Sequence, residues 1–385
     1  MDFSLNEEQK AIQEMALVFS HEALRPYAQK WDAEALFPIE TFQKAAALGL
    51  AGLYVREENG GAGLDRLSAI LVFESLSQGC VSTAAYLSIH NMVAWIIDRF
   101  GTSEHHRKFL PDLLSMKKFG SYCLTEPNSG SDAASLKTKA ILKGDHYIIN
   151  GEKAFISGGG VSDIYIVMVR TGNQNTQGIS AFIVEKDAPG IRFGRPEHKM
   201  GWSSQPTTAV IFEDCAVPKE NLLGQEGEGF KIALKALDGG RLNIAACSLG
   251  GATRCLEMAH HYMQERTQFG KKLSSFQALQ FCYANMASDL EASRLLLYKA
   301  GWTLSHQSEE IHTQATLFSA MAKKFVTDQC FNIANQALQI HGGYGYIKDY
   351  EVERFVRDLR VHQILEGTNE IMRVIIARKL LGDIK

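Results

Sequence analysis

The chain has 385 residues, 45% of them hydrophobic and 22% charged, which is the composition of an ordinary folded protein with two or three domains. Its 40 basic residues are balanced by 43 acidic ones, so the charge gives no reason to expect nucleic acid as a partner. No apolar run is long enough to span a membrane, and the amino terminus, MDFSLNEEQK, is acidic where a targeting signal would be basic. We expect a cytoplasmic chain of bacterial type, or a mitochondrial chain in its matured form.

The first part of the chain is predicted to be helical throughout. Asn6 followed by Gln9 resembles a helix capping box, and apolar residues then recur on one helical face. Further helical runs are expected at 39–50, 66–78, 84–100 and 103–116. We assign an all-α domain to residues 1–120.

The period changes from about residue 121. Short β-branched and aromatic runs, such as HYIIN and IYIVMVR, are separated by Gly-Asp, Asn-Gly and longer glycine loops. This pattern is typical of antiparallel strands joined by tight turns. We assign residues 121–228 to a β domain, built as an antiparallel barrel or sandwich.

Helical spacing returns after Gly229. Apolar residues follow intervals of 3 and 4, as in a helix packed nearly antiparallel with its neighbours, at Leu242, Ala245, Leu249, Ala252, Leu256, Ala259 and Met263. No proline follows Pro218, so long helices are permitted there. Residues 229–385 are predicted to form a four-helix bundle, which makes the whole chain an α+β multidomain protein.

Metal and disulfide sites are not indicated. The seven cysteines are odd in number, scattered and never in a CxxC pair, so we interpret them as small core residues. His341 and His362 lack partners at metal-ligand spacing. We expect both histidines to be hydrogen-bonded structural residues.

Two motifs of the β domain have a structural and a functional interpretation. YCLTEPNSGSD, residues 122–132, is rich in turn residues, and its small side chains would also let the backbone approach a planar ring or a phosphate. FISGG, residues 155–159, ends a predicted strand and on its own indicates a hairpin end.

Three motifs of the helical region are equally ambiguous. In ERTQFGKKLSSFQ, Gly270 could cap one helix and Ser274 with Gln277 could begin the next, but Arg266 and Phe269 would also suit a pyrophosphate and an adjoining ring. QALQIHGGYGY either stops a helix or brings backbone close to a ligand. LDGGR could supply an N-cap and a surface ion pair, or contacts to a substrate.

LEGTNEIMR places Glu366 between apolar residues and a glycine, just before a predicted helix. A carboxylate in such surroundings is costly unless it is paired or neutralised. It would act as a favourable charge at the helix start, as the partner of a cation, or as a proton carrier.

In this order and spacing, the five motifs YCLTEPNSGSD, FISGG, RTQFG, QIHGGYG and LEGTNEIMR resemble those of the acyl-CoA dehydrogenase family. The resemblance covers essentially the whole chain. Two positions differ from the commonest family pattern: Asn128 stands where glycine is usual, and Leu365 where straight-chain members often have tyrosine.

The resemblance implies FAD as cofactor and assigns site residues to it. Contacts on the flavin side are expected from Tyr122, Leu124, Thr125, Gly130, Ser131, Phe155, Ile156 and Ser157. A neighbouring subunit's FAD would be held by Arg266, Phe269, Gln277, Gln339, Gly342 and Gly343. Thr368 and Glu370 would complete the cofactor site. Contacts to acyl-CoA are expected from Ser131, Asp238, Arg241, Leu365, Gly367 and Arg378.

The resemblance also implies a reaction. Glu366 would be the catalytic base that removes a proton from Cα, while flavin N5 accepts a hydride from Cβ, because Cβ is not acidic. Motifs such as SIHNM and GWSSQPT are most similar to those of family members that oxidise isobutyryl-CoA to methacrylyl-CoA in valine degradation. Other short-chain or 2-methyl-branched substrates, an acyl-CoA oxidase and a non-catalytic acyl-CoA-binding scaffold are the alternatives. The family habit further implies an electron-transferring flavoprotein as electron acceptor and a homotetramer built as a dimer of dimers.

Overall fold

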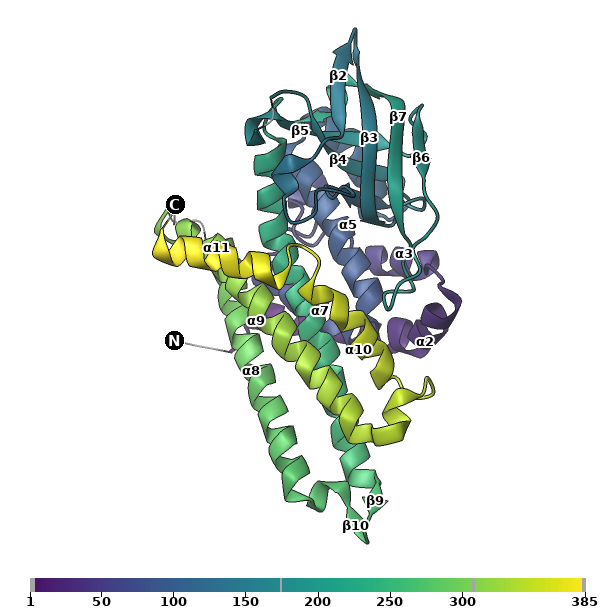
Figure 1. Cartoon of the computed structure of the whole chain (residues 1–385), viewed down its shortest axis with the longest axis vertical. Coiled ribbons are helices and arrows are strands. Elements are labelled where there is room, and N and C mark those ends of the chain that lie inside the picture. Colours follow the sequence, from purple (N-terminus) through teal and green to yellow (C-terminus); the bar gives the residue numbers. More distant parts are fainter. Residues whose placement is uncertain (1–3, 174, 307–308, 383–385) are drawn as a thin grey trace.

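The computed structural model describes residues 4–173, 175–306 and 309–382. Figure 1 shows a β domain at one end, long helices extending from it to the other end, and the N-terminal helices packed beside both. Among the described residues, no helix combines the length and the apolar character needed to cross a membrane.

The N-terminal region contains six α-helices: α1 (Glu7–Phe19), α2 (Arg25–Glu34), α3 (Ile39–Ala47), α4 (Arg66–Ser77), α5 (Val81–Phe100) and α6 (Ser103–Leu114). A π-helical turn, Ser20–Leu24, joins α1 to α2. The predicted capping box is present, because the Gln9 amide donates to Asn6 Oδ1 at 2.8 Å and the Asn6 amide to Gln9 Oε1 at 3.1 Å. Helices α4 and α5 are buried on almost every face, as helices without a polar side require.

The β domain is one eight-stranded sheet with the order β6-β7-β3-β2-β4-β5-β8, and β1 pairs with β4. The strands are β1 (Gly120–Cys123), β2 (Lys139–Lys143), β3 (His146–Ser157), β4 (Ile164–Arg170), β5 (Ile179–Glu185), β6 (Ile191–Phe193), β7 (Thr207–Pro218) and β8 (Leu222–Leu223). Most pairs are antiparallel, as predicted, but β1 runs parallel to β4 and one further parallel bridge joins β2 to β4. Turn residues in the sequence predict pairing only between strands that follow one another in the chain. They could not predict that β1 pairs with β4.

The C-terminal region contains α7 (Gly229–Glu265), α8 (Gln277–Ser305), α9 (Glu309–His341), α10 (Val352–Arg360) and α11 (Asn369–Leu381). Helices α7, α8 and α9 lie side by side, and α10 packs beside them (Figure 1). The predicted seam of α7 is buried along its length, except that Leu256 is only partly buried.

Short 3-10 turns connect these elements at Glu57–Asn59, Ala133–Ser135, Thr176–Gly178, Lys219–Asn221, Leu273–Ser275, Gly342–Tyr346 and Val361–Gln363. The chain reverses between α7 and α8 in a small hairpin of β9 (Thr267–Gln268) and β10 (Lys271–Lys272). Phe269 and Gly270 form its two-residue turn, with φ of 52° and 78°. The prediction that Gly270 caps α7 is therefore wrong, because two successive positive φ angles suit a hairpin turn.

Two further helix-end predictions are corrected. Ser274 and Gln277 form no capping box, because α8 begins at Gln277 and its N-cap residue, Phe276, makes no side-chain cap. Asp238 is not an N-cap, because α7 already begins at Gly229.

The structural role expected for the histidines is confirmed. His341 Nδ1 hydrogen-bonds with the Ala337 carbonyl at 2.7 Å, and His362 Nδ1 with Ser248 Oγ at 2.6 Å. The cysteines are free thiols, all buried except the half-buried Cys282.

Helix α7 links the two halves of the molecule. Near its start, Ile232, Ala233 and Ala236 join an apolar core with side chains of β4, β5 and α5. Further along, its residues belong to the core of the helical bundle. The middle of α7 therefore runs past the place where the β domain, the N-terminal helices and the C-terminal helices meet.

Candidate active site

Glu366 lies in the short loop between the 3-10 turn at Val361–Gln363 and α11. Its φ is 54°, in the left-handed region that few non-glycine residues adopt, and Gly367 follows with φ of 88°. Strain of this kind persists only where the surroundings hold it, and it frequently accompanies function. Part of the residue is accessible, yet its Oε2 is buried and has no hydrogen-bond partner among the described residues.

The Glu366 carboxylate rests directly against the backbone of α7. A Cβ built on Gly240 would lie 2.1 Å from Glu366 Oε2 and 2.8 Å from its Cδ, far inside van der Waals contact. Only glycine at position 240 leaves room for the carboxylate in this position.

Burial controls the electrostatics of this carboxylate. Loss of hydration raises the pKa of Glu366 to about 7, and the positive charges of Arg241 and Lys323 lower it only in part. Neither cation pairs with the carboxylate: Arg241 forms an ion pair with Asp238 at 2.7 Å, and its Nε approaches the Glu366 backbone carbonyl at 3.4 Å. Glu366 is thus a carboxyl group close to half ionised near neutral pH.

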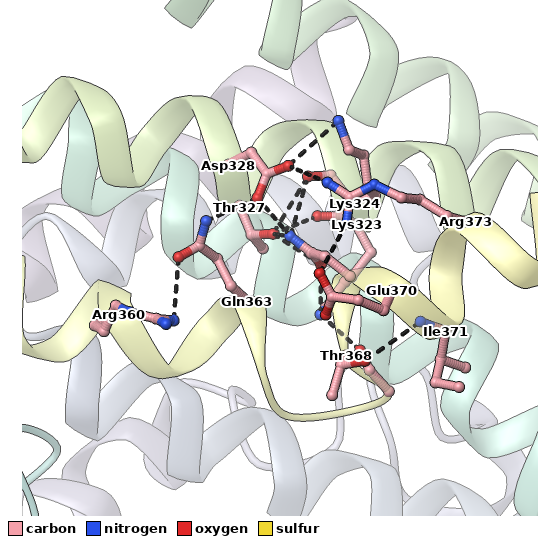
Figure 2. Close-up of polar contacts among 12 residues, drawn as sticks. Lys323, Lys324, Thr327, Asp328, Arg360, Gln363, Thr368, Glu370, Ile371 and Arg373 are labelled. Atoms are coloured by element: carbon pink, nitrogen blue, oxygen red, sulfur yellow. Dashed lines mark hydrogen bonds and ion pairs between the residues drawn. The ribbon is translucent and has the colours of Figure 1, made fainter. Parts of the chain in front are cut away.

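Lys323 of α9 holds the loop that carries Glu366. Its Nζ donates to the Gly367 carbonyl at 2.8 Å and to Asn369 Oδ1 at 2.9 Å, while Asn369 Nδ2 donates to Asp328 Oδ1 at 2.7 Å. Figure 2 shows Lys323 and Asp328 on α9 reaching toward the loop and the start of α11. Burial lowers the pKa of Lys323 to about 8. These bonds fix the strained backbone without neutralising the Glu366 side chain.

The start of α11 shows which residues cap this helix and supply its favourable negative charge. Thr368 is the N-cap residue and its hydroxyl accepts from the Ile371 amide at 3.3 Å, as expected for a helix start (Figure 2). The exposed Glu370 pairs with Arg373 at 2.9 Å and occupies the first helical turn. Because Glu370 supplies the charge that favours the helix start, Glu366 is not needed for that purpose.

Two phenols lie close enough to Glu366 to be affected by its charge. The Tyr122 hydroxyl, from β1, is buried without a partner in the described chain, and its pKa is raised by burial and by Glu366. The Tyr54 hydroxyl accepts from Asn243 Nδ2 at 3.1 Å, and the Arg66 guanidinium lies 3.8 Å from the Tyr54 ring centroid. Burial is the main cause of the raised pKa of Tyr54 as well.

The two β-domain motifs are brought together by one backbone hydrogen bond. The Ala154 amide donates to the Thr125 carbonyl at 2.9 Å, so the loop after β1 lies against the end of β3. Phe155 is left with φ of 58° and with 68% of its surface exposed, although Leu124 and Ile156 beside it are buried. An exposed aromatic ring held in a strained conformation is suited to stack on a ligand.

The remaining predicted residues of this region face solvent to different degrees. Ser157 is half-buried and its carbonyl accepts from Ser121 Oγ at 2.5 Å. Gly130 and Ser131 are exposed in the loop after β1, and Arg378 is exposed on α11.

A second group of predicted residues lies at the far end of α7 and α9. A cavity of about 450 Å³ is lined by Arg266, Gly342, Gly343 and Tyr344, among others, and the Arg266 guanidinium lies 5.5 Å from the Tyr344 ring centroid. A Cβ on either glycine would meet no atom within 4 Å, so the backbone there is open to a ligand. The predicted residues around it are all exposed: Phe269 at 94%, Gln277 and Gln339.

Three family models match the chain in succession. They describe the N-terminal, middle and C-terminal domains of acyl-CoA dehydrogenase and match residues 6–117, 121–215 and 227–381. The chain belongs to the acyl-CoA dehydrogenase family. The predicted family, fold and FAD-dependent oxidoreductase class are thereby confirmed.

Individual relatives agree with this assignment. The mitochondrial isobutyryl-CoA dehydrogenase of Bos taurus is 56% identical over 379 residues, covering 98% of this chain and 90% of the relative. Butyryl-CoA dehydrogenase from Megasphaera elsdenii has a TM-score of 0.94 at 39% identity, covering 99% and 100%. A chain solved in a study of the electron-transferring flavoprotein of Acidaminococcus fermentans has a TM-score of 0.95 at 45% identity, covering 100% of both.

The residues present fit the FAD of an acyl-CoA dehydrogenase. The Tyr122 hydroxyl, which has no partner among the described residues, the exposed Phe155 ring and the glycine-lined cavity beside Arg266 are each open to a ligand. The sequence patterns did not indicate that Gly240, Lys323 and Tyr54 lie at the site. Gly240 lies inside the LDGGR motif, but its reason for being glycine is Glu366, which is 126 positions away in the sequence.

Proposed function

We propose that this acyl-CoA dehydrogenase oxidises a short, branched acyl-CoA, isobutyryl-CoA to methacrylyl-CoA in the first instance, with Glu366 as the catalytic base. The observation that supports the base is the Glu366 carboxylate, whose buried Oε2 has no hydrogen-bond partner among the described residues. It lies against Gly240 on a strained loop that Lys323 holds by a hydrogen bond. The substrate class is supported by the isobutyryl-CoA dehydrogenase relative at 56% identity.

Proton removal from Cα of a thioester needs a base whose pKa lies near the working pH and a polarised thioester carbonyl. Burial gives Glu366 such a pKa, about 7. The backbone amide of Glu366 donates to no other group in the part of the chain that the structure describes, so it is free to bind the thioester oxygen. Bound FAD would supply the hydride acceptor, N5, for the hydrogen on Cβ.

Substrate contacts are assigned to residues near this loop. Leu365 and Gly367 flank the base, and the ion pair of the half-buried Asp238 with the buried Arg241 lies on α7 next to Gly240. Thr316 Oγ1 donates to Asp238 Oδ2 at 2.7 Å and fixes the pair. We assign the exposed Ser131 and Arg378 to the outer part of acyl-CoA, where a cation suits phosphate.

The two groups of FAD residues are proposed to serve different FAD molecules. From Arg241, close to Glu366, to Glu265 at the end of α7, the helix spans roughly 36 Å at 1.5 Å per residue. The β domain, which carries Phe155, and the β9–β10 hairpin, which follows Arg266, lie toward opposite ends of the molecule (Figure 1). We therefore assign Phe155 and Arg266 of one chain to different FAD molecules. The Arg266 cavity would therefore hold part of a neighbouring subunit's FAD, in a homotetramer built as a dimer of dimers.

The electron acceptor is proposed to be an electron-transferring flavoprotein. The likeness to the Acidaminococcus fermentans chain, at a TM-score of 0.95, supports this partner. An oxidase would instead pass its electrons to oxygen. Comparison of peroxide production with reduction of an electron-transferring flavoprotein separates the two.

The pH dependence of catalysis should report the raised pKa of Glu366. The base must be ionised to accept a proton, so kcat/KM for isobutyryl-CoA is expected to rise with pH and to level off above a midpoint near 7. Initial rates between pH 5 and 9, with an acceptor that does not titrate in this range, provide the measurement. A kcat/KM that stays flat from pH 5 to 9, as an ordinary glutamate pKa of 4.5 would give, would contradict a buried base.

Substrate preference tests the branch of the family. We expect kcat/KM to be highest for isobutyryl-CoA. 2-Methylbutyryl-CoA carries one methylene more and should lie below it by about 10-fold or more, since one methylene changes pocket binding by about 10- to 200-fold. Butyryl-CoA, the straight-chain isomer, should also lie below isobutyryl-CoA. Octanoyl-CoA should be the poorest of the four. A preference for octanoyl-CoA would refute the short-chain assignment while leaving the dehydrogenase chemistry intact.

A further inference from the structure

A fully buried lysine lies behind the proposed flavin site. Lys153, on β3, has no exposed surface, and its Nζ donates to Glu126 Oε1 at 2.8 Å and to the Leu124 carbonyl at 3.1 Å. Glu126 also accepts from the backbone amides of Lys137 at 2.6 Å and Thr138 at 2.9 Å. Burial raises the pKa of Glu126, but the Lys153 charge and these hydrogen bonds outweigh burial and leave the pKa lowered. The carboxylate therefore stays ionised opposite the ammonium.

The lysine fixes the orientation of one peptide group. No cis peptide bond occurs in the described chain, so the Leu124 carbonyl and the Thr125 N–H point in opposite directions. Because the carbonyl points at Lys153 in the interior, the N–H must point away from it, to the other side of the loop. No acceptor for the Thr125 N–H is found among the described residues. A partly exposed donor is thus held ready for a ligand.

The same lysine lies beside the irregularity in β3. The register of β3 against β7 shifts between Lys153 and Ile156, and within that shift Phe155 adopts its positive φ. Ala154, directly after Lys153, donates to the Thr125 carbonyl. Lys153 therefore connects both segments assigned to the flavin, and it does so from the side away from the ligand.

We propose that Lys153 is a positioning residue that orients and polarises the Leu124–Thr125 peptide, so that the Thr125 N–H favours the reduced, more negative flavin over the oxidised one. This inference rests on the proposed flavin position at Leu124, Thr125 and Phe155. A hydrogen-bonded ammonium on the carbonyl strengthens the N–H of the same peptide as a donor. Preorganised donors of this kind act without reorganisation in a buried site.

Three variants separate the effect of the ammonium from that of the ion pair. Lys153→Met removes the donor to Leu124 but leaves Glu126 buried without its partner, which can cost stability. The double variant Lys153→Met/Glu126→Gln removes the donor without leaving a buried charge. Glu126→Gln alone removes the counter-ion of Lys153, whose pKa is already lowered by burial, but it keeps Nζ as a donor to the Leu124 carbonyl and serves as the control.

The measurement is the two-electron midpoint potential of the flavin in each holoenzyme, together with the dissociation constant of FAD and the visible spectrum. Both variants that lack Lys153 should lose about 10-fold in preference for reduced over oxidised flavin, a fall of about 30 mV for two electrons. Glu126→Gln should stay near the wild-type potential. Either an unchanged potential in the double variant or an equal fall in Glu126→Gln would overturn the proposal.

The expected change in flavin midpoint potential does not depend on whether Glu366 is the base. Glu366→Gln provides the separate test of the proposed reaction, because it addresses turnover and not the Leu124–Thr125 peptide. A normal rate in Glu366→Gln with the expected potentials in the Lys153 variants would reject the base and retain the positioning role. The reverse pattern would reject the positioning role alone.

Discussion

Replacement of Glu366 by glutamine should leave a yellow, FAD-loaded protein whose turnover is lower by a factor of about 10² to 10⁴ or more, the contribution of a general base. Glutamine has the shape of glutamate but cannot accept the Cα proton. The neighbouring cations cannot replace it, because Arg241 and Lys323 are donors already engaged with Asp238 and with the Gly367 carbonyl. Steady-state kcat and the flavin absorbance of the same preparation give the comparison.

Glu14→Gln is the control for this substitution. Glu14 is exposed on α1, which packs against α4, and its variant should turn over at the wild-type rate. A near-normal rate in Glu366→Gln would remove this residue from the mechanism. Loss of flavin together with activity would instead indicate a structural role.

The same substitution has a consequence for stability, with a definite sign. The pKa of Glu366 is about 7 when folded against an ordinary 4.5, so the folded protein holds the proton more tightly than the unfolded chain. Wild-type stability is then lost as pH rises from about 4.5 to 7, because ionisation in the buried site is unfavourable. The glutamine variant should melt at a higher temperature than wild type above pH 7, and at the same temperature near pH 4.

Local patterns predicted most of the fold. The Asn6 capping box and the apolar spacing along α7 are decided by residues within a few positions of one another, and the structure contains both. Errors occurred where local chemistry allowed two outcomes. Gly270 has a positive φ, as a cap would, but in a hairpin turn that follows Phe269.

The site depends on contacts between distant positions, and these had no local signal. Glu366 meets Gly240, Lys323 bonds the Gly367 carbonyl, and the charge of Glu366 reaches the phenol of Tyr54. A lysine inside a helical run looks like a surface residue until the fold buries it. Only the order of the five motifs, compared with a known family, allowed Glu366 to be proposed as the base from sequence.

The function of the loop depends on a balance between two opposing effects. A carboxylate left in water would be a weak base, and one fully paired with Arg241 or Lys323 would be weaker still. In this structure both cations bond to backbone or to other side chains, while the glutamate is desolvated. The loop is thus stabilised by positive groups that do not neutralise the Glu366 carboxylate.

Gly240→Ala should lower kcat by about 100-fold or more while leaving FAD bound and the protein at least as stable as wild type. The new Cβ would lie 2.1 Å from Glu366 Oε2, so the carboxylate must move, and a displacement of about 1 Å can cost about 10² in rate. Alanine in a helix interior is otherwise favoured over glycine by about 1 kcal/mol. Loss of activity without loss of stability would separate a displaced base from a damaged fold.

A control substitution on α7 and a second substitution at Glu366 test this explanation. Gly251→Ala adds a methyl group to α7 at 3.1 Å from Val81 Cγ2, away from Glu366, and should keep its turnover. Glu366→Asp shortens the acid by one methylene and frees space at Gly240, so the double variant Gly240→Ala/Glu366→Asp should be less impaired than the product of the two single losses. If the fall in kcat of the double variant equals the product of the two single falls, the methyl group and the carboxylate are not in contact. The reason is that substitutions at contacting residues are coupled, whereas substitutions at distant residues are independent.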